Sequence, residues 1–441
     1  MTSTPYTLTQ VALNEMLDFA QYTVASRAIP NMIDGMKPVQ RFYLYSSLKN
    51  SRHGFKKVSA ISGIISDYGY NHGEVSAANA GQLMAATWRN NICLVEGEGS
   101  FGTRQVQAAG AARYIKTKVS QNFDRYITDI NLSPEHDDPE HEPPAFYLPV
   151  LPLVLLNGTT GIATGFATNI LPRDEADVIA HIRSLLAGKT PKGELNVKFP
   201  DFNGTTVYDA TTDRYICSGI YRKIGKTKLL IEEIPYGYDR ETYIKVLDDL
   251  EDNSLIVSYE DQTGSHGFRF AVKLKEQTSA KWTPAEIVKK FKLEKSHAEN
   301  LTVIGAANDL REYTNPRDLI HDFLRFRLGV LTARIDLAVT SHDELLRWLT
   351  AKIEFIQAVL DDKITFKNKN RKQAGEDIMS FTSALESDTS RLLSMNILSL
   401  TKEQVTALKN EIKEAKARLK YWKNTTPNDQ YVEDLNALHL H

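Results

Sequence analysis

The feature that most constrains the fold is a heptad pattern of apolar residues near the end of the chain. Apolar side chains recur there at intervals of 3, 4, 3, 4 and 3 residues, at Val405, Leu408, Ile412, Ala415, Leu419 and Trp422. A helix with one such seam has to bury it against another helix. Helical spacing from Pro316 to about Val339 indicates an antiparallel partner, with a small globular tip between the two helices. An ordinary helical bundle core is the alternative explanation of the same spacing.

The rest of the chain divides at an acidic, proline-rich loop, residues 133–144. Helical periodicity and a short strand before this loop fit a winged helix, at residues 8–24, 38–48, 76–88 and 92–95. After the loop, alternating apolar residues predict strands of an α/β region, at 227–234 and 268–274. We therefore expect three domains, at residues 1–148, 149–312 and 313–441.

Charge is distributed unevenly, although the net charge is only −2. Residues 1–120 hold 12 Lys and Arg against 7 Asp and Glu, whereas residues 121–150 hold one Arg and seven acids. The basic region suits a phosphate backbone held on one face, and a merely solvated surface is the alternative. No apolar run reaches the ~18 residues of a membrane helix, and no secretory signal is present. With two cysteines as well, we expect a cytoplasmic protein that binds no membrane and no zinc.

Several familiar cofactor motifs are incomplete. Residues 97–102 match G-x-G-x-x-G, but the helix and the acid about 20 residues on that a dinucleotide site needs are missing. Residues 188–190 and 225–227 end like a P-loop, yet Arg183 and Ile220 stand where its first glycine belongs. The histidines and acids of the 133–144 loop lack the spacing of a metal site. We therefore predict no cofactor-binding and no metal-binding residues in this chain.

The remaining candidate for chemistry is the pair Arg113-Tyr114, inside a segment that also carries Lys116 and Lys118. A tyrosine phenolate can attack a DNA phosphorus and form a phosphotyrosyl bond, and neighbouring cations stabilise the charge that develops. For an Arg-Tyr pair taken alone, an ordinary packed tyrosine is the alternative.

Five segments, in order, resemble the signatures of the type IIA DNA topoisomerases. They are residues 26–41 (SRAIPNMIDGMKPVQR), 70–74 (YNHGE), 99–104 (GSFGTR), 112–115 (ARYI) and 157–165 (NGTTGIATG). Weaker similarities extend the resemblance from about residue 22 to 435. The match is closer to eukaryotic enzymes than to bacterial gyrase A, and it starts at the half that cleaves DNA. The resemblance thus implies a eukaryote-like enzyme split into subunits, as in T-even bacteriophages.

This resemblance implies an α+β multidomain fold, with a winged-helix DNA-gate domain, an α/β tower domain and a long antiparallel coiled coil. A C-terminal dimer gate is expected at about 340–400. The implied function is DNA cleavage and rejoining within an ATP-dependent type II topoisomerase, through a transient double-strand break and a 5′-phosphotyrosyl bond. Partners are double-stranded DNA, a second copy of the chain, and ATPase/TOPRIM subunits that bind ATP and supply Mg²⁺ in trans. Because the chain ends soon after the coiled coil, we expect strand passage to relax and decatenate DNA rather than supercoil it. If phage-encoded, such a chain acts in the host cytoplasm.

The resemblance also assigns four catalytic residues. Tyr114 matches the nucleophile, and Arg113 matches the residue that stabilises the transition state. Arg27 and His72 match positions that contact the scissile phosphate and assist the activation of the tyrosine.

Four further residues match positions on the bound DNA. Lys37 and Arg41 correspond to contacts with the DNA backbone, and Arg104 closes the GSFGTR motif. Ile162 corresponds to an isoleucine that wedges between bases and bends the duplex, although an isoleucine is usually a core residue.

The chain departs from the family pattern at four positions. Asn71 replaces a histidine, and Phe42 replaces the basic residue that usually follows Arg41, so neither position provides a backup cation. Val75 and Asn79 stand where bacterial enzymes carry the serine and acid that contact quinolones, so we expect weak quinolone binding.

Two other classes of protein stay open on the sequence. The basic region and the paired helices alone are compatible with a non-catalytic, architectural DNA-binding protein, which forms no covalent adduct with DNA. The G-x-G-x-x-G match leaves a nucleotide-dependent oxidoreductase as a remote alternative, which cofactor binding would reveal.

Overall fold

The computed structural model describes residues 16–367, 369–396 and 402–438. The chain divides into two compact units, residues 1–327 with 435–441, and residues 328–434. The expected domains 1–148 and 149–312 both fall in the first unit, and the division between them stays a prediction. Residues 8–15 of the expected first helix lie outside the described residues. Among the described helices, none is long and apolar enough to cross a membrane.

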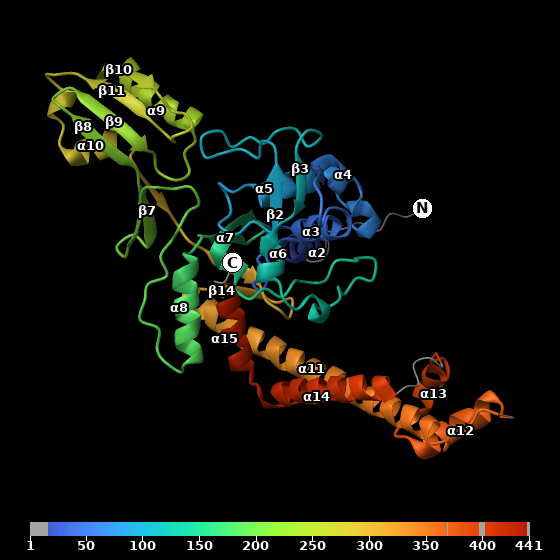
Figure 1. Cartoon of the computed structure of the whole chain (residues 1–441). Coiled ribbons are helices and arrows are strands. Elements are labelled where there is room, and N and C mark those ends of the chain that lie inside the picture. The colour runs from blue at the N-terminus through green and yellow to red at the C-terminus, as the bar shows by residue number, and fades with distance from the viewer. Residues whose placement is uncertain (1–15, 368, 397–401, 439–441) are drawn as a thin grey trace, which may run out of the picture. The chain divides into compact units, whose positions relative to one another are not determined.

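The first part of the first unit consists of helices packed on a small antiparallel sheet (Figure 1). Its elements are α2 (Met16–Thr23), the π-helix η2 (Val24–Ala28), α3 (Pro38–Asn50), β1 (Lys56–Lys57), α4 (Val58–Gly63), η3 (Ile65–Tyr68), α5 (Glu74–Ala85), β2 (Val95–Glu98) and β3 (Lys116–Val119). Proline at its first position favours the start of α3. Helix α3 is joined to the sheet by a hydrogen bond of 2.7 Å between the Tyr43 and Thr117 hydroxyls. Gly81 lets α5 cross α3 closely, because a Cβ there would lie 2.1 Å from the Tyr43 ring.

Two β-hairpins follow in the same unit and contact each other. They lie among short helices, and the elements are α6 (Gln121–Tyr126), η4 (Ile130–Leu132), α7 (Leu153–Asn157), β4 (Thr159–Ile162), β5 (Ala167–Ile170), α8 (Glu175–Leu186), β13 (Leu301–Ile304) and β14 (Leu310–Tyr313). Asn169 and Asn300 exchange two backbone hydrogen bonds of 2.9 Å, which join β5 to the segment before β13. Ile304 forms a parallel bridge with Asn31, so the second hairpin also supports the segment that precedes α3.

A separate lobe of the first unit is built on two antiparallel sheets, with strand orders β12-β7-β6 and β10-β11-β9-β8. Its elements are β6 (Thr205–Asp209), β7 (Arg214–Ser218), β8 (Ile220–Ile224), β9 (Lys228–Glu233), α9 (Arg240–Asp252), β10 (Ile256–Asp261), β11 (Phe270–Leu274), η5 (Ser279–Lys281), α10 (Pro284–Lys290) and β12 (Glu294–His297). The alternation predicted for residues 227–234 and 268–274 corresponds to β9 and β11. Side chains of the four-stranded sheet, α9 and α10 share one apolar core.

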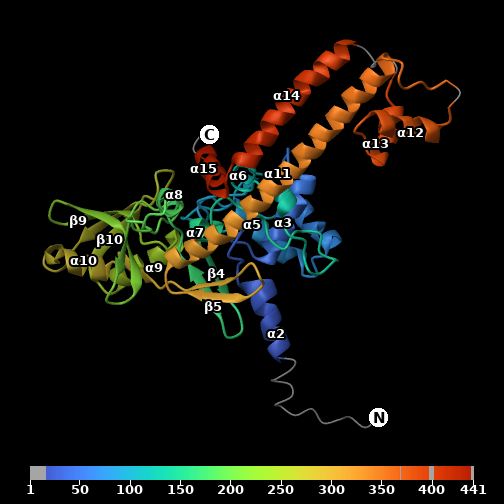
Figure 2. The ribbon, with the colours of Figure 1, turned by 90° about the horizontal axis from the view of Figure 1, so that it is seen from below.

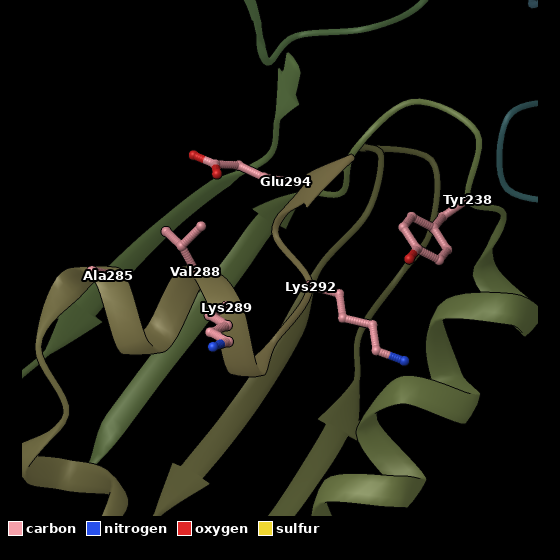
Figure 3. Close-up of a pocket in the computed structure, with 6 residues that line it drawn as sticks. All are labelled: Tyr238, Ala285, Val288, Lys289, Lys292 and Glu294. Atoms are coloured by element: carbon pink, nitrogen blue, oxygen red, sulfur yellow. The ribbon is translucent and has the colours of Figure 1, made fainter. Parts of the chain in front are cut away.

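A cavity of about 470 Å³ lies beside α10 in this lobe (Figure 3). Ala285, Val288 and Lys289 line it from the helix, and Lys292 and Tyr238 line it from the turns nearby. It belongs to a different part of the unit from the β2–β3 connection that carries Tyr114.

The second unit is helical (Figures 1 and 2). Its elements are the continuation of α11 (Pro316–Leu360), α12 (Arg371–Phe381), α13 (Glu386–Leu393), α14 (Lys402–Asn424) and the first part of α15 (Pro427–Ala437). Helix α11 extends well past Val339, where the apolar spacing predicted its end. Helix α14 runs beside α11 in the opposite direction, and both contribute to one apolar core. Three of the six seam residues, Val405, Leu408 and Ala415, are buried in that core, and Ile412 packs against it.

Candidate functional site

Tyr114 lies on the connection between β2 and β3, and the residue is 71% exposed. The backbone on both sides of it is held against the start of α4. Ser59 N donates to Ala112 O at 3.1 Å, and Val58 N donates to Ile115 O at 3.1 Å. Tyr114 N itself donates to Ala111 O at 2.8 Å. A phenol on a fixed backbone with an exposed ring is well placed to meet a macromolecular substrate.

Arg113 is exposed as well, and its guanidinium carbon lies 4.8 Å from the centre of the Tyr114 ring. The glycines that resemble a dinucleotide motif shape the other end of the same connection. Gly99 and Gly102 have φ of 111° and 80°, which favour glycine. They form a turn, and no helix follows, so this segment lacks the helix that would bind a dinucleotide.

The segment that precedes α3 is organised around the buried carboxylate of Asp34. Its Oδ1 accepts a hydrogen bond from Met36 N at 2.9 Å, and its Oδ2 accepts from Tyr147 N at 3.1 Å. Arg41 Nε donates to Asp34 Oδ2 at 2.7 Å, and its second nitrogen donates to Met36 O at 2.8 Å. Arg41 is only 8% exposed. The role of Arg41 in binding the DNA backbone remains a prediction. In the structure, the Arg41 guanidinium is hydrogen-bonded to groups of the protein itself.

Arg104 has a similar buried environment. Its guanidinium donates to Glu233 Oε1 at 2.9 Å and to Asp201 O at 3.0 Å. It also lies against the rings of Phe202, Tyr236 and Phe268, at 5.1, 5.4 and 5.2 Å from their centres. The side chain is 6% exposed. The DNA contact of Arg104 therefore stays a prediction. Within the protein, the Arg104 side chain joins the β2–β3 connection to β9.

Lys37 joins the Asp34 segment to the β4–β5 hairpin. Its Nζ donates to Thr160 O at 2.9 Å. Burial, and then repulsion from Arg89, lower the pKa of Lys37 below its ordinary value. The hairpin also packs on the end of η2, because a Cβ on Gly161 would lie 2.1 Å from Ala28 O.

Ile162 follows at the tip of this hairpin and is 86% exposed. The tip is closed by Ala163 N, which donates to Phe166 O at 2.8 Å. An isoleucine this exposed has no packing role within the chain, so the core interpretation of Ile162 is wrong for this residue.

Arg27 and His72 are both exposed and lie on neighbouring segments. Arg27 belongs to η2, directly after α2, and His72 precedes α5. The Tyr22 hydroxyl and His72 Nε2 are 2.6 Å apart, which links the two segments. The ring of Tyr70 meets His72 edge-on at 5.4 Å. Burial raises the pKa of Tyr70, against the opposing effects of its hydrogen bond to Ser76 and of the charge of Arg27.

These contacts place six of the eight predicted residues in two groups, and Arg41 and Arg104 are the two buried residues already described. Arg27, His72, Lys37 and Ile162 belong to elements that contact one another, whereas Arg113 and Tyr114 share the β2–β3 connection. Within the described ranges, no hydrogen bond or ring contact joins the second group to the first. Sequence reasoning assigned no role to Asp34 or Tyr70, although both lie in the quoted motifs.

The residues at the quinolone-related positions lie on the solvent side of α5. Val75 is 72% exposed, and Asn79 is exposed one turn later. Phe42 is buried and packs against the rings of Tyr70 and His141, at 5.2 and 5.1 Å. Phe42, which stands in place of a basic residue, thus adds apolar contacts next to the segment that carries His72.

Comparisons with known proteins identify the family of the chain. Residues 27–440 match the family model that describes the A subunit of DNA gyrase/topoisomerase IV. The DNA topoisomerase medium subunit of Enterobacteria phage T4 is 42% identical, over 96% of this chain and 97% of that protein. The mitochondrial DNA topoisomerase 2 of Dictyostelium discoideum is 27% identical over 97% of this chain, which spans 34% of that relative.

A solved structure shows the same similarity. The DNA-binding, cleavage and re-ligation domain of Plasmodium falciparum topoisomerase II matches with a TM-score of 0.84 and 27% identity. The match covers 96% of this chain and 63% of that one. The fold is accordingly a mixed α/β fold like that of the topoisomerase II cleavage region. On these matches, the chain belongs to the type II DNA topoisomerases, in the family of the DNA gyrase and topoisomerase IV A subunits.

Proposed function

We propose that this chain cleaves and rejoins double-stranded DNA within a type II topoisomerase, with Tyr114 as the nucleophile. The observation that carries the proposal is the exposed Tyr114 ring on a fixed backbone, beside Arg113, in a chain of this family. A non-catalytic DNA-binding protein has no need of such a tyrosine.

In the proposed reaction, Tyr114 Oη attacks a phosphorus of the DNA backbone. The bond from phosphorus to O3′ breaks, so the 5′ side stays on the protein as a phosphotyrosyl ester. The proton lost by the phenol is balanced by the proton that the leaving 3′ oxygen gains. Rejoining is the reverse attack by the 3′ hydroxyl. The exchange of one phosphate ester for another conserves the bond, so the broken DNA can be resealed without an external energy source.

Three side chains assist this step in the proposal. Arg113 stabilises the negative charge that develops on the phosphate oxygens. Arg27 and His72 approach the same phosphate from η2 and from the segment before α5, where both are exposed. Because no hydrogen bond or ring contact among the described residues joins them to Tyr114, the proposal assigns the bridge between the two groups to the bound DNA.

Holding the duplex is assigned to the surface around η2 and the β4–β5 hairpin. Lys37 adds positive charge at the base of the hairpin, and the exposed Ile162 inserts between bases to bend the DNA. Arg41 supports this surface through its buried pair with Asp34. Arg104, buried with Glu233, is proposed to act in the same indirect way.

The architecture of the family completes the proposal. Helices α3 to α5 with the β1-β3-β2 sheet form a winged-helix DNA-gate domain, and the two-sheet lobe forms the tower. Helices α11 and α14 form the coiled coil. Exposed apolar residues near its tip support a dimer gate between two copies of the chain, at Leu360, Phe366, Met379, Phe381 and Leu385.

Further subunits are required by this function. Partner ATPase/TOPRIM subunits are proposed to bind ATP and to supply Mg²⁺ in trans. Among the described residues, no group of three or more His, Cys, Asp or Glu is arranged to hold a metal ion. Mg²⁺ would neutralise charge on the scissile phosphate. Strand passage through the break then relaxes or decatenates DNA, in the host cytoplasm for a phage-encoded enzyme.

A covalent-trapping assay tests the proposal. The chain is mixed with ATPase/TOPRIM subunits, Mg²⁺ and end-labelled plasmid, and the reaction is stopped with detergent. We expect labelled DNA on the wild-type chain and none on Tyr114→Phe. Tyr208→Phe is the matched control, because Tyr208 is also exposed and should keep the adduct. Label that survives in Tyr114→Phe moves the nucleophile elsewhere, and DNA binding without any adduct supports the architectural alternative.

A further inference from the structure

The hydrogen bond between Tyr22 and His72 is the contact in the candidate site that no sequence motif predicts. Tyr22 lies on α2, fifty positions before His72, and its hydroxyl is 2.6 Å from His72 Nε2. The two rings are 6.2 Å apart and tilted by 56°. Tyr70 also packs edge-on against His72, at 5.4 Å. The imidazole thus contacts two tyrosines and remains exposed.

We propose that Tyr22 is a positioning residue that keeps a proton on His72 Nδ1 in both charge states of the ring. This inference rests on the proposed role of His72 in DNA cleavage. The hydrogen bond made by one ring nitrogen of a histidine determines which tautomer the neutral ring adopts. An imidazole nitrogen accepts a hydrogen bond more readily than a phenol oxygen, so in the neutral ring the Tyr22 hydroxyl donates to Nε2. The ring proton then resides on Nδ1.

Protonation of His72 changes the direction of this hydrogen bond without breaking it. In the cation both ring nitrogens carry protons, so Nε2–H donates to the Tyr22 oxygen, and Nδ1–H stays in place. His72 therefore presents the same donor to a phosphate oxygen whether the ring is neutral or charged. Without the hydroxyl, the neutral ring is free to carry its proton on Nε2, which turns Nδ1 into an acceptor facing a phosphate.

The charged groups around His72 do not determine its tautomer in place of Tyr22. The cavity of about 690 Å³ beside it is also lined by Arg41, Glu135, His136, Asp137, Asp138 and His141. Arg27 acts on the neighbouring Tyr70 through its charge. Arg41 is already paired with Asp34, and His136 and His141 contact each other at 3.4 Å. Among the described residues, the Tyr22 hydroxyl is the polar group within hydrogen-bond distance of the His72 ring.

The pH dependence of cleavage separates this role from a structural one. We expect the charge of His72 to have little effect on cleavage by the wild-type complex. In Tyr22→Phe, cleavage should match wild type at acid pH, where the ring is charged, and fall several-fold at alkaline pH, where the ring is neutral. A Tyr22→Phe profile parallel to that of wild type at every pH would overturn the proposal.

A spectroscopic measurement on the chain alone makes the inference independent of activity. Long-range ¹⁵N–¹H correlation spectra of histidine-labelled protein report the tautomer of each ring, and the His72→Gln variant identifies the His72 signals. We expect the Nδ1–H tautomer at neutral pH in wild type and a shift towards Nε2–H in Tyr22→Phe. Tyr208→Phe should change nothing. An Nε2–H tautomer in wild type refutes the positioning role, whereas the expected tautomer in a chain that forms no DNA adduct refutes the proposed function instead.

Discussion

Four arginines of the family-like motifs occupy two contrasting environments. Arg27 and Arg113 are exposed, and neither forms an ion pair among the described residues. Arg41 and Arg104 are 8% and 6% exposed and pair with the buried carboxylates of Asp34 and Glu233. All four count equally in the positive charge of residues 1–120. Only the exposed pair can meet a phosphate without first breaking a buried contact, so a motif match alone does not distinguish a ligand-binding arginine from a structural one.

The largest expected effect follows from the burial of Arg104. Arg104→Leu leaves the Glu233 carboxylate buried, 2% exposed, without a cation. Breaking one side of a buried ion pair typically costs about 3–5 kcal/mol. Urea unfolding should therefore show a loss of that size in the free energy of unfolding.

The double variant Arg104→Leu/Glu233→Leu is the control for this prediction, because it removes both charges together. It should recover part of the lost stability. If Arg104→Leu is as stable as wild type and instead binds DNA less tightly, the contrast between buried and exposed arginines fails for this residue.

The opposite result is expected for Arg113. Arg113→Ala should leave the urea midpoint unchanged, because the side chain is exposed. Loss of one group that stabilises transition-state charge typically lowers the rate about 10²–10³-fold. Single-turnover formation of the Tyr114 adduct measures this loss, and a variant that cleaves at the wild-type rate would remove Arg113 from the catalytic group.

The contrast between exposed and buried arginines also shows which features could be predicted from the sequence. Local periodicity was sufficient to locate α3 and the seam of α14, since helices are encoded by neighbouring residues. The burial of Arg104 depends on Glu233, which lies 129 positions away, and the Tyr22–His72 contact spans 50 positions. No pattern within a motif carries such information. The limit of α11 was missed because its apolar spacing is imperfect, although packing against α14 stabilises the helix beyond Val339.

Exposure was equally hard to infer from residue type. Isoleucine and tyrosine are usually packed, yet Ile162 and Tyr114 are 86% and 71% exposed. Hydrogen bonds hold the backbone around both of them, at the hairpin tip and against α4. The resemblance to the family predicted a role for these positions, and the physics of the single residues did not.

The smallest expected effect concerns the salt dependence of DNA binding. Each cation that neutralises a phosphate contributes about 0.9 to the slope of log affinity against log salt concentration. Arg27→Gln should therefore lower the magnitude of this slope by about 0.9, in a titration of the full chain with a fluorescent duplex. Arg222→Gln, which changes an exposed arginine on β8 with Glu232 as its partner, is the control that should leave the slope unchanged.

Arg41→Gln should weaken folding without changing the slope, because the Arg41 guanidinium is bound to Asp34 before any DNA arrives. If the slope falls equally for Arg27→Gln and Arg41→Gln, Arg41 leaves its buried pair with Asp34 to contact a phosphate. Arg27 and Arg41 would then belong to one DNA-binding surface.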